Sequence, residues 1–217
     1  MSEVIVSRSV GVGALSDRMG ELVSVSIPIR AAEGLTDAQL VARAVDGERW
    51  GREMLYRRHA GSLLAMTTRL IGNRGEAEEI VQDTFVTGFE QLHMLREGGA
   101  VRAWLGQIAV SLVRRRIRRL KLARLVGLDR GADDATLDSL ADPEMSVDQK
   151  VELRLVDRLL SGVRTELRIA WMLRRVEGLE LAEVASLCKC SLATAKRRIG
   201  QVDDLVRRHA GGLEVQP

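Results

Sequence analysis

From Thr36 onward, hydrophobic residues recur at spacings of three and four, which is the period of amphipathic α-helices. A first helix is expected in TDAQLVARAVDG, with Thr36 or Asp37 as its N-cap and Gly47 closing it. A longer helix is expected at about 49–71, before a turn in GNRG at 72–75. Its predicted buried stripe is Leu55, His59, Leu63, Met66 and Leu70.

The next segment, GEAEEIVQDTFVTGFEQL at 75–92, holds five acidic residues and no basic one. Glu76 and Glu90 lie at the ends of its polar side. An acidic face is repelled by DNA, so it is either simply solvated or bound by another partner. The predicted apolar face is Ala77, Ile80, Val81, Thr84, Phe85, Gly88 and Leu92. The predicted acidic face is Glu78, Glu79, Gln82 and Asp83.

A loop, HMLREGGA, leads to a helix expected at about 101–122, whose C-terminal end is strongly basic. The stretch SLVRRRIRRLK contains five Arg and one Lys. These cations suit a solvated helix end, but their density favours contact with nucleic-acid phosphates. The candidate phosphate contacts are Arg114, Arg115, Arg116, Arg118 and Arg119. The expected buried residues are Trp104, Leu105, Ile108, Leu112 and Val113.

An acidic stretch at 127–149 separates these four helices from a second helical unit at about 146–210. In the second unit, Gly178 is expected to cap the helix ELRIAWMLRRVEG. The expected buried residues are Val151, Leu155, Val156, Leu159, Leu160, Ile169, Ala170, Leu173 and Val176.

The last two helices of this unit, joined at KC, form a helix-turn-helix pattern with Ser191 as the predicted N-cap of the second helix. Leu192, Ala195, Ile199 and Val202 are expected to face the core. Small residues at the helix start would allow close approach to DNA; a solvated basic face is the alternative. The candidate DNA-binding residues are Ser191, Leu192, Ala193, Thr194, Lys196, Arg197 and Arg198.

Composition agrees with an all-α protein, because aromatic residues make up only 3% of the 217 residues and there are three prolines. Neither an apolar run of about 18 residues nor an export signal is visible, so a cytoplasmic protein is expected. Cys188 and Cys190 are too close for a comfortable disulfide and too few for a zinc site. With no cofactor motif and no catalytic constellation, an enzyme is not expected.

Three stretches resemble the sigma-70 family of bacterial RNA polymerase initiation factors, in its short extracytoplasmic function (ECF) form. They are YRRHAGSLLAMTTRLIGNRGEAEEIVQDTFV, VRAWLGQIA and RIAWMLRRVEGLELAEVASLCKCSLATAKRRI, and the resemblance covers about residues 36–208. It implies two small domains, at 34–125 and 147–210, joined by a flexible acidic linker at 126–146. Segments 1–33 and 211–217 would be an N-terminal extension and a tail.

The resemblance also implies partners. The acidic face would dock on the clamp helices of core RNA polymerase, with the flap as a further contact. The first domain would melt the promoter at the minus-ten element, with the loop at 93–100 holding a flipped base. The residues implied there, besides the five arginines, are His93, Arg96, Arg102, Trp104 and Gln107.

The second domain would bind the minus-thirty-five element as duplex, through the helix from Ser191. The sequence departs from the family pattern at three positions, and the loop HMLREGG also lacks the aromatic residue often found there. Phe89 stands where Trp is common, Ala195 replaces the usual valine, and Cys190 replaces the usual glycine. Members of the group are often held inactive by an anti-sigma factor, which is a further candidate partner. The alternative function is a stand-alone helix-turn-helix regulator, which would bind duplex DNA without polymerase.

Overall fold

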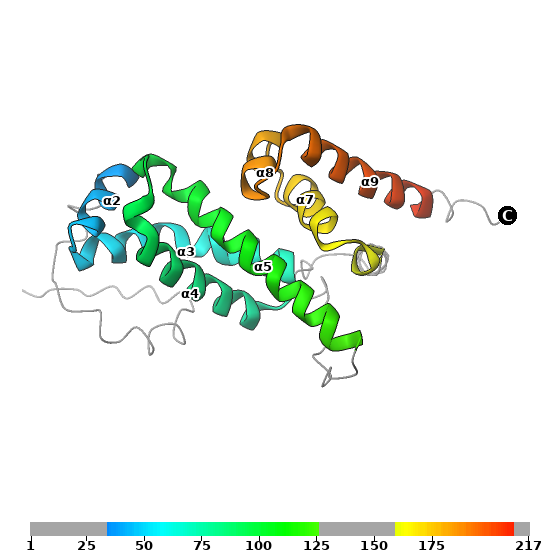
Figure 1. Cartoon of the computed structure of the whole chain (residues 1–217), viewed down its shortest axis with the longest axis horizontal. Coiled ribbons are helices and arrows are strands. Elements are labelled where there is room, and N and C mark those ends of the chain that lie inside the picture. The colour runs from blue at the N-terminus through cyan, green and yellow to red at the C-terminus, as the bar shows by residue number, and fades with distance from the viewer. Residues whose placement is uncertain (1–33, 126–158, 211–217) are drawn as a thin grey trace, which may run out of the picture.

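The computed structural model describes residues 34–125 and 159–210, and these segments contain helices and no strand. The prediction of an all-α fold is therefore confirmed for the described residues (Figure 1). The predicted N-terminal extension, acidic linker and C-terminal tail lie outside them, as do the core candidates Val151, Leu155 and Val156.

The described residues form two halves (Figure 1). The first half, 34–125, has four α-helices and two short 3₁₀ turns: α2 (Asp37–Val45), α3 (Arg49–Ile71), α4 (Arg74–Gln91), η1 (Leu92–Met94), η2 (Gly98–Ala100) and α5 (Val101–Leu125). The second half, 159–210, starts with a helical turn at 159–162 and continues with α7 (Thr165–Arg175), α8 (Leu181–Leu187) and α9 (Leu192–Ala210).

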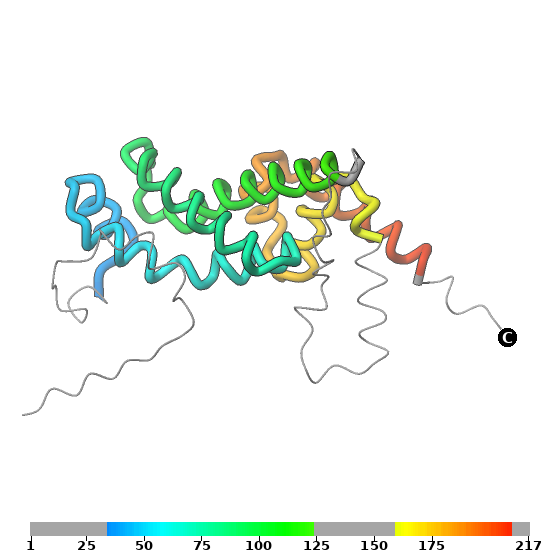
Figure 2. The backbone as a smooth tube through the Cα atoms, turned by 90° about the horizontal axis from the view of Figure 1, so that it is seen from below, coloured from blue at the N-terminus to red at the C-terminus, as the bar shows by residue number. Residues whose placement is uncertain are grey.

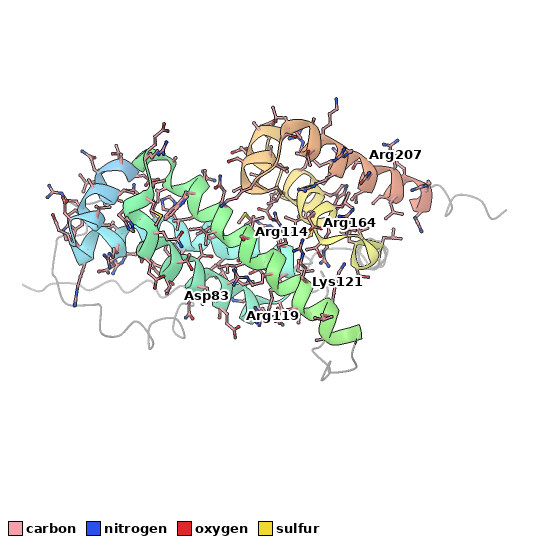
Figure 3. The ribbon with its side chains drawn as sticks, in the orientation of Figure 1. Asp83, Arg114, Arg119, Lys121, Arg164 and Arg207 are labelled. Atoms are coloured by element: carbon pink, nitrogen blue, oxygen red, sulfur yellow. The ribbon has the colours of Figure 1, made fainter. Side chains whose placement is uncertain are left out.

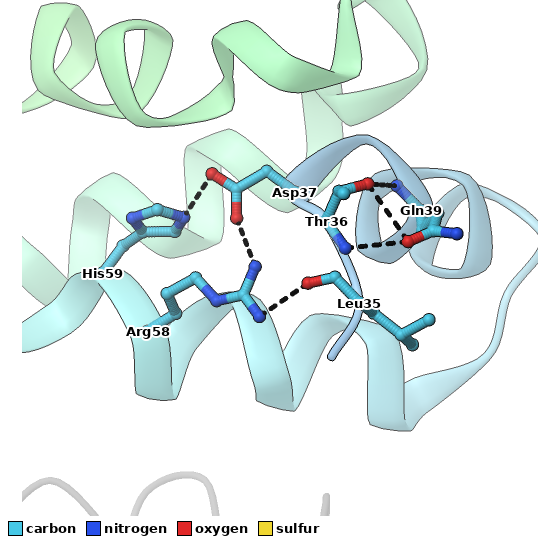
Figure 4. Close-up of polar contacts among 6 residues, drawn as sticks. All are labelled: Leu35, Thr36, Asp37, Gln39, Arg58 and His59. Atoms are coloured by element: carbon cyan, nitrogen blue, oxygen red, sulfur yellow. Dashed lines mark hydrogen bonds and ion pairs between the residues drawn. The ribbon is translucent and has the colours of Figure 1, made fainter. Parts of the chain in front are cut away.

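The start of α2 is stabilised by a capping box, which decides between the two predicted caps (Figure 4). The Thr36 Oγ1 accepts the backbone N–H of Gln39 at 3.3 Å, and the Gln39 Oε1 accepts the backbone N–H of Thr36 at 2.8 Å. Asp37 instead ties α2 to α3: its carboxylate accepts from the Arg58 Nη1 at 2.7 Å and lies 3.1 Å from the His59 Nε2. Thr36 is therefore the N-cap of α2, and Asp37 joins α2 to α3.

The core of the first half follows the predicted stripes. Every residue predicted for the inner faces of α3 and α4 is buried. Phe85 of α4 packs on Tyr56 of α3, with ring centroids 4.8 Å apart. Gly88 lets α5 approach α4 closely, because a Cβ there would lie only 2.7 Å from the Leu105 Cδ2. On α5, Leu105 and Val113 are buried as expected, while Trp104, Ile108 and Leu112 are half-buried.

In the second half α7 packs along α9, and the predicted core residues Leu160, Ile169 and Leu173 are buried. Two core predictions are wrong. Leu192 is 54% exposed because it is the first residue of α9, where the preceding turn leaves it uncovered. Val176, the C-cap of α7, is 44% exposed although its backbone is still helical and its N–H bonds to the Met172 carbonyl, so it continues the helix without being covered.

The two halves share one continuous hydrophobic core. Both α7 and α8 pack against α5, and Figure 2 shows the second half lying along that helix. Gly106 of α5 is buried at this contact, and a Cβ on it would lie 2.7 Å from the Leu187 Cδ2 of α8. A residue without a side chain thus allows α5 and α8 to pack closely.

Candidate nucleic-acid and protein interfaces

The acidic face, defined as Glu78, Glu79, Gln82 and Asp83, lies on the outer side of α4. Burial of the opposite apolar side fixes the rotation of the helix, so that Glu79 and Asp83 are exposed. Glu78 is half-buried and pairs with Arg74 at 3.1 Å, and Gln82 is also half-buried. Asp83 makes no ion pair with any residue in the described segments.

One arginine of the basic stretch reaches back to α4. The Arg116 Nε lies 3.1 Å from the Glu76 Oε2, and its Nη2 lies 3.1 Å from the Glu79 Oε2. Burial alone would lower the pKa of Arg116, but the hydrogen bonds and charges of the two carboxylates outweigh it and raise that pKa. Part of the acidic face is therefore neutralised within the chain, while Asp83 has no ion-pair partner in 34–125 or 159–210.

Val86 continues the exposed side of α4 and was not identified from the sequence. It stands one helical turn beyond Asp83, is 58% exposed, and borders a hollow of about 440 Å³ between α2, α3, α4 and η1. Its exposure could have been predicted from spacing, because Val86 falls on the side of the helix where Glu79, Asp83 and Glu90 recur every three or four residues. The hollow is lined by Ala44, Val45, Arg52, Val86, Phe89, Glu90, Leu92 and His93.

The five arginines of α5 divide into two groups. Arg115 and Arg119, one turn apart, are exposed and have no partner among the described residues. Arg116 pairs with the acids of α4, as above, and the remaining two contact the second half. The Arg114 Nη2 donates to the backbone carbonyl of Cys188 at 3.3 Å, and Arg118 pairs with Glu166 of α7. Figure 3 shows Arg114 on the side of α5 toward the second half and Arg119 away from it.

The remaining predicted minus-ten residues lie between η1 and the middle of α5. His93, Arg96 and Arg102 are exposed. Trp104 is half-buried and packs against the core beside Gly88, as a core residue would. Gln107 faces the second half, and its Nε2 donates to the Ser186 Oγ at 3.1 Å.

The helices α8 and α9 meet in a tight turn, where Lys189 takes a left-handed backbone conformation with φ of 49°. The predicted cap is confirmed, because the Ser191 Oγ accepts the backbone N–H of Thr194 at 3.2 Å. Thr194 and Arg198 are half-buried. The start of α9 thus presents small and basic residues to solvent. The exposed candidates are Ser191, Leu192, Ala193, Lys196 and Arg197.

The position of α9 is set by polar contacts to α7. Asp203 of α9 accepts from the Trp171 Nε1 at 2.8 Å and from the Arg175 Nη2 at 2.6 Å. The hydrogen bond from Arg175 lowers the pKa of the Asp203 carboxyl, so the pair is charged at neutral pH. These bonds hold the two helices in a fixed orientation.

The chain is similar to known proteins of one family. The model of sigma-70 region 2 matches residues 55–122, which include α4 and most of α5. The ECF RNA polymerase sigma-E factors of Salmonella typhimurium and Escherichia coli are each 25% identical over 191 residues, covering 82% of this chain and all of theirs. The chain is therefore similar to the sigma-70 family, in its region 2, and to ECF sigma factors over most of its length.

Solved structures with the same fold include CnrH in complex with the cytosolic domain of CnrY, with a TM-score of 0.55 and 24% identity over 81% of this chain and 97% of that one. The sigma factor RpoE in complex with the anti-sigma factor NepR from Bartonella quintana has a TM-score of 0.52 and 21% identity, over 72% of this chain and 94% of that one. These likenesses concern the fold alone.

Across 34–125 and 159–210, no helix is both long and apolar enough to cross a membrane. In the same segments, no three His, Cys, Asp or Glu side chains gather as metal ligands would. Cys188 is buried, and burial together with the neighbouring Cys190 raises the pKa of its thiol to about 11. Cys188 therefore packs in the core as a small hydrophobic residue.

Proposed function

We propose that this protein is a sigma-70 family member of the ECF group, which binds core RNA polymerase through the acidic face of α4 and directs it to promoters through α5 and α9. The observation that carries the proposal is the free carboxylate of Asp83, exposed on α4 inside the region 2 match. A solvent-exposed acid next to a basic helix would be expected to pair with it. Asp83 instead remains available to a basic partner.

The partner on the acidic face is a positively charged helical surface, for which the clamp helices of core polymerase are the candidate. The exposed Val86 lies beside the acids. An apolar anchor surrounded by charged groups is the usual composition of a small protein interface, with the charges setting orientation and association rate. DNA is disfavoured as the partner here, because phosphates would be repelled by the same carboxylates.

Two basic surfaces would bind the promoter. Arg115 and Arg119 are placed for backbone phosphates near the minus-ten element, since both are exposed and free of described partners. His93, Arg96 and Arg102 are exposed beside them and would contact the opened strand. Trp104 would support this loop rather than stack on a base, because it already packs on the core.

The start of α9 would read the minus-thirty-five element as duplex. The N-cap Ser191 and the first two residues of α9, Leu192 and Ala193, are exposed. Ser191 and Ala193 are small enough to let the helix approach base edges closely. Lys196 and Arg197 follow directly and would hold the helix on the phosphates. The protein would act without covalent chemistry of its own. Promoter melting would then draw on binding energy alone.

An anti-sigma factor is the proposed regulatory partner. One fold neighbour is a sigma factor in complex with the anti-sigma factor NepR, and another is in complex with the cytosolic domain of CnrY. The stand-alone regulator is not favoured, because sigma region 2 and relatives named as ECF sigma factors match this chain.

The test is the affinity of the full chain for core RNA polymerase. Asp83→Arg is expected to weaken binding at least tenfold, because the new guanidinium would face basic clamp residues. Asp204→Arg is the matched control: it makes the same charge change at another exposed acid, on the far part of α9. Wild-type affinity of Asp83→Arg would exclude the acidic face as the polymerase contact.

A further inference from the structure

The outer side of α9 continues beyond the first two turns that carry the candidate DNA-binding residues. Ala195, Ile199 and Val202 face the core and are at most 6% exposed. An α-helix turns by about 100° per residue, so one side of α9 lies opposite these three residues. The residues on that side are Ala193, Arg197, Gly200, Gln201 and Asp204. Gln201 is exposed and was not identified as a candidate from the sequence.

Gly200 is the residue on this outer side that packing within the chain does not explain. A Cβ on Gly200 would meet nothing within 4 Å, whereas a Cβ on Gly88 or Gly106 would lie 2.7 Å from a leucine side chain. The backbone of Gly200 is helical and has no positive φ that would require glycine. Glycine inside a helix is destabilising relative to alanine. Within 34–125 and 159–210, no other element uses the space that the missing side chain leaves.

A gap halfway along the outer side of a helix is useful when the length of the helix meets a partner. The major groove of duplex DNA is wide enough to admit an α-helix, and a residue without a side chain lets the backbone come closer to the bases. The ten residue steps from Ser191 to Gln201 rise about 15 Å at about 1.5 Å per residue. At about 3.4 Å per base pair, this length covers about four base pairs.

Gln201 is the side chain next to this gap that is suited to reading a base. In the described segments, neither a hydrogen bond nor an ion pair ties its side chain to the rest of the chain. Its amide offers one acceptor and two donors. Adenine presents an acceptor, N7, beside a donor, the N6 amino group, and therefore pairs with this amide through two hydrogen bonds. Guanine presents two acceptors in the same place, so the amide oxygen would have no donor there.

Asp204 marks the end of the surface that DNA can approach. It lies one turn beyond Gly200 on the same side of α9, and its side chain is 63% exposed. The Asp204 Oδ1 lies 3.0 Å from the Arg207 Nη2. A carboxylate on the outer side repels phosphates, in contrast to the cations at Lys196 and Arg197. A helix lying in the groove would therefore leave it between Gln201 and Asp204.

We propose that α9 lies lengthwise in the major groove, with Gly200 at the closest approach and Gln201 as a specificity-determining residue that selects adenine. This inference rests on the proposed function, because it takes duplex DNA as the ligand of α9. It extends the recognised element from the first turn of α9 to about four consecutive base pairs. The adenine lies at the end of the element remote from Ser191. Replacing this adenine by guanine would weaken binding about tenfold, as the loss of one paired contact does.

The first test identifies the bound element by selection from duplexes with a randomised minus-thirty-five region, using the full chain in complex with core polymerase. The wild-type protein is expected to enrich adenine at one end of the element. Gln201→Ala should lose this preference about tenfold and keep the others, and Gln201→Arg should change it to guanine, which arginine pairs through O6 and N7. The same preference in all three proteins would overturn the proposal. Absence of any enriched element with the wild-type complex would instead count against the proposed function.

The second test separates close approach to DNA from the stability of the helix. Gly200→Ala is expected to stabilise the protein toward urea, because alanine favours the helix, and to weaken binding of the selected element about tenfold, because the methyl group keeps α9 away from the groove. Gly61→Ala in α3 is the matched control: its Cβ also meets nothing within 4 Å, and it should stabilise without changing DNA affinity. A loss of affinity in a stabilised variant cannot come from unfolding. Equal affinities of Gly200→Ala and Gly61→Ala would overturn the lengthwise placement of α9.

Discussion

The Arg116 Nη2 on α5 lies 3.1 Å from the Glu79 Oε2 on α4, so an arginine of the basic stretch neutralises part of the acidic face. Arg116 also contacts Glu76, and its own side chain is 26% exposed. Its neighbour Arg115 is exposed and unpaired among the described residues. Two adjacent arginines are thus expected to behave differently toward DNA.

We expect Arg115→Ala to lower the salt dependence of DNA binding by the free protein, with the slope of log K against log salt changing by about 0.9. Arg116→Ala should leave the slope nearly unchanged, because that guanidinium is already neutralised by carboxylates. Titrations of a duplex at several salt concentrations measure both slopes. Equal reductions in the two variants would show that Arg116 leaves Glu79 and contacts phosphate.

Two glycines of α3 should respond to alanine in opposite directions. A Cβ on Gly51 would lie 2.8 Å from the backbone nitrogen of Ala44 and 3.1 Å from the backbone oxygen of Leu40. Backbone atoms of α2 cannot move aside easily, so Gly51→Ala should destabilise by about 1–3 kcal/mol. Gly61 meets nothing within 4 Å, and Gly61→Ala should stabilise the helix by about 0.5–1 kcal/mol. Urea denaturation of both variants checks the prediction; the idea fails if Gly51→Ala is neutral.

The two cysteines should differ in reactivity toward a thiol reagent. Burial raises the pKa of Cys188 to about 11, so only roughly one in a thousand of its thiols would be ionised at pH 8. Cys190 is half-buried in the turn and is expected to react first. Kinetics with a chromogenic disulfide at pH 8 should show one fast thiol and one that reacts only on unfolding. Two fast thiols in the folded protein would contradict the burial of Cys188.

The Asp203–Arg175 pair should make stability depend on pH in the acid range. The hydrogen bond from Arg175 lowers the folded-state pKa of Asp203 below its usual range. The pair therefore contributes fully above the unfolded pKa of about 3.9 and is lost as pH falls through the lower folded value. Asp203→Asn keeps an acceptor for Trp171 and removes the charge. It should cost about 1 kcal/mol or less at pH 7, since Arg175 is 51% exposed.

Thermal melts of wild type and Asp203→Asn between pH 3 and pH 7 measure this dependence. The difference in Tm should be largest at neutral pH and shrink as pH falls below about 4. Arg207→Ala is a suitable control, because it breaks an ion pair between two exposed side chains of the same helix. Arg207 is 75% exposed and its partner Asp204 is 63% exposed. A difference in Tm that stays constant over the whole range would assign the effect of Asp203 to packing rather than charge.

Much of the fold could be predicted from the sequence because it is governed by local spacing. The bounds of α3, the cap of α9 and the buried faces of α3 and α4 all agree with the predictions. The errors at Val176 and Leu192 lie at helix ends: Val176 follows the last residue of α7, and Leu192 is the first residue of α9. Hydrophobic periodicity predicts which side of a helix faces the core, but it does not predict how far along the helix a neighbouring element covers that side.

The sequence predicted which residues belong to each candidate surface. Helix packing decided which of those residues pair within the chain and which stay exposed. The sequence by itself determined that α4 has an acidic side and that α5 ends in arginines, because both follow from residue type and helical period. Only the tertiary structure decided that Arg116 turns to Glu79, that Arg114 and Arg118 hold the second half, and that Asp83 stays free. Those contacts join residues far apart in the chain, and their geometry depends on how whole helices pack.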